Sequence, residues 1–139
     1  MSFDLDNVRN GLALALKQVP GLRAAAFVPP KILPPIAIVG DGGGNYDDTF
    51  SGEANATIPV LVVISRTVDR VAQRKLDAYV STAGAQSVPA AILANRTLPY
   101  LAAATVDDAR VTKWDAAHGV EIGGVPYFCV EFHVEVLFP

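Results

Sequence analysis

One stretch of the chain, Val39 to Phe50 (VGDGGGNYDDTF), contains the residue types most typical of a binding loop. Three consecutive glycines stand among Asp41, Asp47 and Asp48. Glycine-rich backbone can cradle a phosphate, carboxylates can hold a calcium ion, and a polar, glycine-rich segment can stay mobile until a partner orders it. The surrounding residues discriminate among these three possibilities.

Phosphate binding is the least supported of the three. A P-loop needs a lysine and a Ser or Thr after its glycines, whereas Asn45 and Tyr46 follow here. There is also no basic residue between Lys31 and Arg66. A bound phosphate would therefore meet carboxylates without a cation from the same stretch.

Calcium has suitable ligands in this loop but not the expected spacing. Asp41, Asp47 and Asp48 offer hard oxygen atoms, yet they do not follow the EF-hand pattern. Glycine entropy and the repulsion of like charges both oppose order here. We therefore predict that Gly40 to Glu53 is a mobile, solvated loop with an acidic, cation-free surface.

A second group of chemically capable residues lies near the C-terminus. Glu131, His133 and Glu135 alternate along one predicted strand, so their side chains share a face. They could hold a metal if the neighbouring strand added a ligand. The polar outer face of an antiparallel strand explains the same pattern without a metal, and we favour that explanation.

Nucleophilic catalysis has less support still. The sequence has no G-x-S-x-G motif, and Cys129 lies in the middle of a predicted strand without a group to lower its pKa. We therefore predict no catalytic residues, no metal, no cofactor and no enzymatic activity.

The first two thirds of the chain predict helices and short strands. Apolar residues at helical spacing, capping residues and Pro or Gly breakers mark three helices, and the second of them takes Thr67 as its N-cap. Its apolar stripe should include Val68, Val71, Ala72, Leu76, Tyr79 and Val80. The predicted helices are Asp4–Lys17, a segment after Thr67, and Ala90–Ala94 with Ser87 as cap; the predicted strands are Leu22–Phe27, Ile36–Val39 and Thr57–Ser65.

The last third predicts antiparallel strands. Arg110–Trp114 alternates, and Val120–Ile122 should pair with Val125–Tyr127 across a type I′ turn at Gly123-Gly124. The final strand alternates most clearly. Its predicted buried residues are Phe128, Val130, Phe132, Val134, Val136 and Phe138, and its predicted outer residues are Cys129, Glu131, His133 and Glu135.

These elements predict a single domain over residues 1–139. The fold class is α/β (α+β): one mixed, mostly antiparallel sheet of four to six strands, with two or three helices on its apolar face. A chain of 139 residues can bury enough surface to fold without a disulfide or a metal.

Composition points to assembly rather than to nucleic-acid binding. Charged residues make up 18% of the chain, against about 25% in an average domain, and the mean hydropathy is +0.33. Such a surface is expected to be covered partly by other subunits. The net charge of −3 argues against gripping phosphates, and we expect neither an export signal nor a membrane span.

The order of these pieces resembles the tail terminator proteins of long-tailed (siphovirus) bacteriophages, especially those of actinobacterial phages. The resemblance covers most of the chain and rests on order, length and character rather than on a catalytic motif. It is carried by a short N-terminal helix leading to GLRAAAFVPPKILPPIAIVG, by YDDTF, by PVLVVISRTVDRVAQRKLDAYV with its following small-residue helix, and by GGVPYFCVEFHVEV.

The resemblance implies an architectural role in the virion, after assembly in the host cytoplasm. Such proteins form a ring, usually hexameric, at the head-proximal end of the tail tube, where they stop elongation and present the surface for head joining. The implied partners are other copies of the chain, the major tail tube protein and the head-completion or stopper protein, with DNA passing through the lumen without specific binding. The residues that the acidic loop would present to a partner or to the lumen are Asp41, Asn45, Tyr46, Asp47, Asp48 and Glu53.

Three alternatives stay open at this point. One is another neck or tail-completion protein of the same phages, since those proteins have a similar size. The second is a small metal-dependent enzyme that uses Glu131, His133 and Glu135. The third is a monomeric ligand-binding module.

Overall fold

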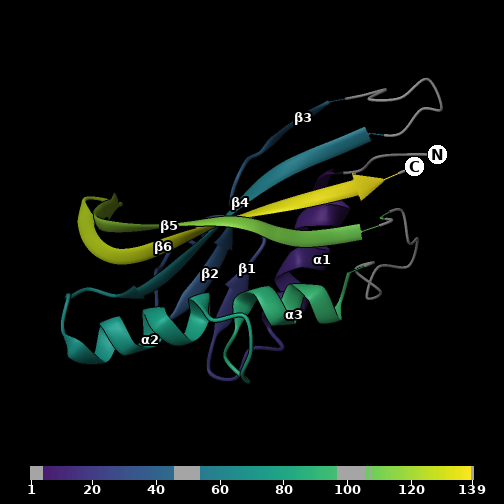
Figure 1. The fold of residues 1–139 in the computed structure, drawn as a ribbon. Coiled ribbons are helices and arrows are strands. Elements are labelled where there is room, and N and C mark those ends of the chain that lie inside the picture. The colour runs from purple at the N-terminus through teal and green to yellow at the C-terminus, as the bar shows by residue number, and fades with distance from the viewer. Residues whose placement is uncertain (1–4, 46–53, 97–105, 107, 139) are drawn as a thin grey trace.

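The computed structural model describes residues 5–45, 54–96, 106 and 108–138 (Figure 1). Its elements follow the expected order, with helices in the first two thirds and a long hairpin at the end. They are α1 (Leu5–Leu16), β1 (Arg23–Ala25), β2 (Ile36–Val39), β3 (Gly43–Asn45), β4 (Ala54–Ser65), α2 (Arg70–Val80), α3 (Val88–Ala94), β5 (Asp108–Ile122) and β6 (Val125–Phe138).

One six-stranded sheet organises the molecule. Its strand order is β1-β2-β4-β6-β5, and β3 pairs with β4 outside this path. Only β1 and β2 run parallel; the other pairs are antiparallel. The three helices lie on one side of the sheet, and the β5–β6 hairpin extends beyond the other strands and curves (Figure 1). The predicted fold class is confirmed.

The main core lies between the sheet and the helices. From β4, the side chains of Ile58, Val60 and Val62 are completely buried on this side, and Phe132 of β6 lies beside them. The helix α1 contributes Leu12 and other apolar residues of its stripe. The alternation of β6 thus predicted its buried face correctly for Phe128, Val130, Phe132, Val134 and Val136; Phe138 lies outside the described side chains.

A second, smaller core lies on the opposite face of the sheet. Cys129 is fully buried there, together with Ile36, Ile38, Val63 and Tyr127. The prediction that Cys129 belongs to a polar outer face is therefore wrong. The outer face is apolar where β2 and the curved tip of the hairpin approach it, and it becomes polar only farther along β6.

The start of the second helix also differs from its prediction. Asp69, not Thr67, is the N-cap, and its carboxylate accepts a hydrogen bond of 2.8 Å from the backbone N–H of Ala72. Thr67 instead donates its hydroxyl to Asp69 at 3.3 Å. Val68 precedes the helix, and Val68 and Val71 are exposed, by 48% and 63%, so they do not belong to the buried stripe.

Two further local predictions are confirmed. Ser87 caps α3 by accepting a hydrogen bond of 3.1 Å from the backbone N–H of Ala90. The hairpin turn pairs Ile122 with Val125, and the φ angles of Gly123 and Gly124 are 61° and 80°, as a type I′ turn requires. Among the described helices, none has the length and apolar character needed to cross a bilayer.

We expect Phe132→Ala to lower the free energy of unfolding by about 3–5 kcal/mol, because it leaves a cavity in the middle of the main core. The matched control is Glu135→Ala on the opposite face of the same strand, which should change stability by less than about 0.5 kcal/mol. Denaturant unfolding measures both variants. Equal losses would contradict the assignment of the two faces of β6.

Candidate functional site

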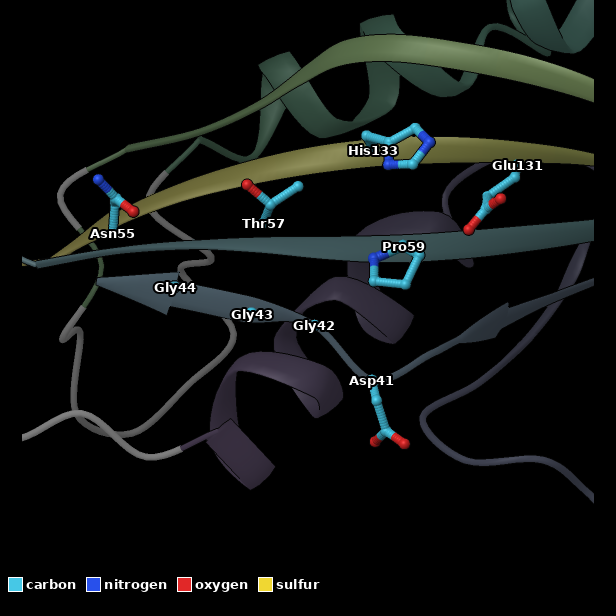
Figure 2. Close-up of a pocket in the computed structure, with 9 residues that line it drawn as sticks. All are labelled: Asp41, Gly42, Gly43, Gly44, Asn55, Thr57, Pro59, Glu131 and His133. Carbon is cyan, nitrogen blue, oxygen red and sulfur yellow. The ribbon is translucent and has the colours of Figure 1, made fainter. Parts of the chain in front are cut away.

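The open face of the sheet carries a cavity of about 550 Å³, on the side away from the helices (Figure 2). Its floor comes from alternate residues of β4 and β6, whose side chains point out of the sheet. Its lining residues are Asp41, Gly42, Gly43, Gly44, Asn55, Thr57, Pro59, Glu131 and His133. The cavity brings part of the predicted acidic loop next to part of the predicted polar strand face.

Two of the three consecutive glycines, Gly43 and Gly44, belong to the strand β3, which corrects the prediction of a loop throughout Gly40 to Glu53. Gly43, Gly44 and Asn45 pair with Thr57, Ala56 and Asn55 of β4. A Cβ atom on Gly44 would collide with the carbonyl oxygen of Asn55, and one on Gly42 with that of Thr57. The glycines therefore allow a close approach of two backbones.

Asp41 has a cationic partner that lies outside its own stretch of sequence. The guanidinium of Arg9, on α1, donates a hydrogen bond to the Asp41 carboxylate. Arg9 is itself buried except for 8% of its surface, and its guanidinium lies 5.0 Å from the ring centre of Phe27. The prediction of a cation-free surface is wrong at Asp41, because the partner comes from a helix that is distant in sequence.

Figure 2 shows where Asp41 lies relative to the cavity. Asp41 lies at the edge opposite His133, and its carboxylate points away from the side chains of His133 and Glu131. It is therefore used to hold the chain after β2 against α1 rather than to face a ligand in the cavity. Of the other predicted loop residues, Asn45 lies in β3, and Tyr46, Asp47, Asp48 and Glu53 lie outside the described residues.

The neighbouring strand does supply a ligand-type residue to the polar face of β6. In the register of the hairpin, Asp115 of β5 is paired with Glu131 and Lys113 with His133. Nε2 of His133 lies 3.0 Å from Oδ2 of Asp115, and the Lys113 ammonium lies 3.6 Å from the same oxygen. The cluster thus consists of Asp115, Glu131 and His133, and Glu135 is not part of it.

The electrostatics of this cluster are uneven. The hydrogen bond from His133, together with the positive charge of Lys113, holds the pKa of Asp115 below its ordinary value, although partial desolvation opposes the effect. Glu131 lies opposite Asp115 and is half-buried, yet no ion pair reaches it within the described part of the chain. The Asp115 carboxylate therefore has a cationic neighbour, whereas the Glu131 carboxylate has none among the described residues.

An apolar hollow of about 300 Å³ adjoins the same face. Pro59 and Glu131 border both cavities, so the face changes from polar to apolar along its length. The rest of the hollow is lined by Val28, Ile38, Gly40, Leu61, Val120 and Ile122. Such a surface can bind a divalent cation at its polar end or an apolar group at the other.

The structure gives Cys129 no nucleophilic character. Burial raises the pKa of its thiol to about 11, so the thiol stays protonated at neutral pH. This agrees with the sequence-based expectation for that residue. The side chain of His118 lies outside the described ones.

Comparison with known proteins does not assign this chain to a family. No family of known proteins matches the chain, and a search of curated proteins returns no match either. The function is therefore inferred from the residues and from their positions in the fold.

The three glycines permit an internally controlled test. Gly44→Ala should lower the free energy of unfolding by about 1–3 kcal/mol, because the added methyl forces β3 away from β4. Gly43→Ala, one residue earlier, meets open space and should be neutral or slightly stabilising, since alanine restricts the unfolded chain. Chemical denaturation of the two variants beside the parent gives the comparison. Equal tolerance of both changes would show that the close β3–β4 approach is absent in solution.

Proposed function

We propose that this protein is a phage tail terminator: a virion protein that assembles as a ring on the head-proximal end of the tail tube and stops its elongation. The proposal rests on the sequence resemblance and on one structural observation, which is the presence of apolar side chains at both lateral edges of the sheet. Its partners are further copies of itself, the tail tube protein and a head-completion protein.

The edge at β1 carries exposed apolar side chains beside two exposed basic residues, Arg23 and Lys31. The segment that joins β1 to β2 carries three large apolar side chains that face solvent: Phe27, Val28 and Leu33 are exposed by 52%, 66% and 46%. In the described part of the chain, β1 pairs only with β2, so its outer backbone groups are open as well. Exposed apolar side chains beside an unpaired strand are typical of an association surface.

The edge at β5 carries one large exposed apolar side chain, Trp114, among charged residues. Trp114 is 48% exposed on β5, the last strand of the sheet, and β5 pairs only with β6 among the described strands. Trp114 lies opposite Phe132 in the register, so it belongs to the helix-covered side of the sheet. Tryptophan is among the residues most enriched at protein interfaces.

Two different apolar edges favour a head-to-tail contact between subunits. When one edge of a subunit meets the other edge of the next, the contact is heterologous, and a closing rotation produces a ring. Neither edge needs a nucleophile or a cofactor. The low charged fraction of the chain, 18%, agrees with lateral surfaces that are covered after assembly.

The acidic segment has a defined place in this scheme. The pairing of Asn45 with Asn55 holds the ends of β3 and β4 together, and Asp47, Asp48 and Glu53 belong to the stretch between those strands. An acidic segment at the rim of a ring repels DNA that passes through the lumen, or it meets a complementary surface on the tube or on the head-completion protein.

A surface test uses one substitution at each edge. Val28→Lys and Trp114→Lys should each shift concentrated protein from closed rings to monomers, because a charge would be buried at the subunit contact. Gln73→Lys, on the exposed face of α2, adds the same charge elsewhere and should leave the rings intact. Sedimentation velocity and negative-stain microscopy measure the outcome, with purified tail tubes as an alternative nucleus. The proposal would be contradicted if the parent protein stays monomeric at every concentration and does not bind the ends of tail tubes.

The decisive test of function is genetic. A phage that lacks the gene should accumulate filled heads beside tails of uncontrolled length, since nothing removes the template for the next tube ring. Electron microscopy of lysates measures tail length directly. If the tails have normal length but do not join heads, the protein is instead a neighbouring neck protein. If normal virions form, the protein has no structural role in the virion.

A further inference from the structure

Two adjacent strands bring three metal-ligating side chains together on the open face of the sheet. Asp115 comes from β5, and Glu131 and His133 come from β6. Their ligand atoms all lie within 4.8 Å of one another. Donor atoms around one ion with bonds of about 2.1 Å lie about 3–4 Å apart, so small rotations of these partly exposed side chains bring them to ligating distance.

The charge distribution favours binding of a cation beside Glu131. Glu131 and Asp115 are directly opposite each other on neighbouring strands, an arrangement that destabilises a sheet when both carry the same charge. His133 and Lys113 approach only the Asp115 carboxylate. Across the described residues, nothing forms an ion pair with Glu131, although it is half-buried and a buried charge normally has a partner.

The cluster is also accessible, because a cavity borders it on one side. Glu131 and His133 line the cavity of about 550 Å³, and their side chains stand on the same strand beside Thr57 and Pro59 of β4 (Figure 2). The cavity leaves room for water molecules to complete the coordination of an ion. The pairing across the hairpin fixes the spacing of the three protein ligands, because the antiparallel register is regular from Lys113 to Ala117.

The ligand types indicate which ions fit. An imidazole nitrogen with two carboxylates suits borderline divalent ions such as Zn²⁺ better than Ca²⁺ or Mg²⁺, which prefer oxygen ligands alone. We propose that Asp115, Glu131 and His133 form a binding site for one divalent transition-metal ion per chain, with solvent in the remaining positions. The site shares the edge strand β5 with the proposed ring contact, but Asp115 lies on the open face of the sheet and Trp114 on the helix-covered side.

Metal binding changes the local interactions in a defined way. Nε2 of His133 exchanges its hydrogen bond to Asp115 for the ion, and the ion replaces Lys113 as the cation beside Asp115. The imidazole nitrogen must be free of a proton to ligate, so protons compete with the ion for this site.

Binding is tested on the tag-free full chain, stripped of metal and dialysed against Zn²⁺. We expect one ion per chain, and a visible absorption band when Co²⁺ takes its place. Glu131→Gln and His133→Gln should each lose about tenfold or more in affinity, since even outer-shell changes cost that much. The control is Glu135→Gln, which removes a carboxylate from the same strand face outside the cluster and should bind as the parent does.

Thermal unfolding separates a metal ligand from a merely structural carboxylate. Without metal, Glu131→Gln should be at least as stable as the parent, because it removes the repulsion with Asp115. With Zn²⁺ the order should reverse, since only the parent gains stability from the bound ion. The absence of saturable binding, an equal loss in Glu135→Gln, or a Glu131→Gln protein that is less stable without metal would each overturn the proposal.

Discussion

The pairing of β4 with β6 is the constraint on which the rest of the structure depends. These two long strands run antiparallel through the middle of the sheet, with a register that places Val60 opposite Phe132 and Leu61 opposite Glu131. Because side chains alternate, this single register sends one row of apolar residues toward the helices and the other row to the open face. A slip of one residue would exchange the two rows and leave α1 and α3 without a surface to cover.

The same constraint gives the open face its two-part character. Near the hairpin tip, the outward residues of β6 are Tyr127 and Cys129, which are buried in the second core. Beyond them, the outward residues are Glu131 and His133, which border the cavity. The apolar residues of β2 and of the hairpin thus cover β6 as far as Cys129, and the polar residues Glu131 and His133 follow directly after it. The polar cluster is held on a rigid strand pair, where its geometry is fixed by backbone hydrogen bonds rather than by a loop.

Local patterns were sufficient to predict most of this fold. The alternation of β6, the cap at Ser87 and the turn at Gly123-Gly124 depend on residues close in sequence, and the structure confirms all three. The start of α2 was harder to predict, because Thr67 and Asp69 are both good caps and only packing selects between them.

Contacts between distant residues could not be derived in this way. The Arg9–Asp41 pair joins residues 32 positions apart, so the stretch from Lys31 to Arg66 looked free of cations although one arrives from α1. Glu131 and His133 were recognised as capable ligands that lacked a partner from the next strand. That partner, Asp115, follows only from the hairpin register, which includes an irregularity between Val111 and Lys113. The glycine run likewise gained its meaning from the backbone of β4, which the sequence alone did not place beside it.

The two proposed activities meet at β5, where the alternation of the strand keeps their side chains apart: Trp114 lies on the helix-covered side and Asp115 on the open face. Association at the edges covers the apolar side chains beside β1 and on β5, while both faces keep their own roles. One face is already covered by helices, so only the open face remains available after a ring has formed. A subunit built in this way can be joined laterally to its neighbours and still present carboxylates and an imidazole to whatever meets the exposed surface of the sheet.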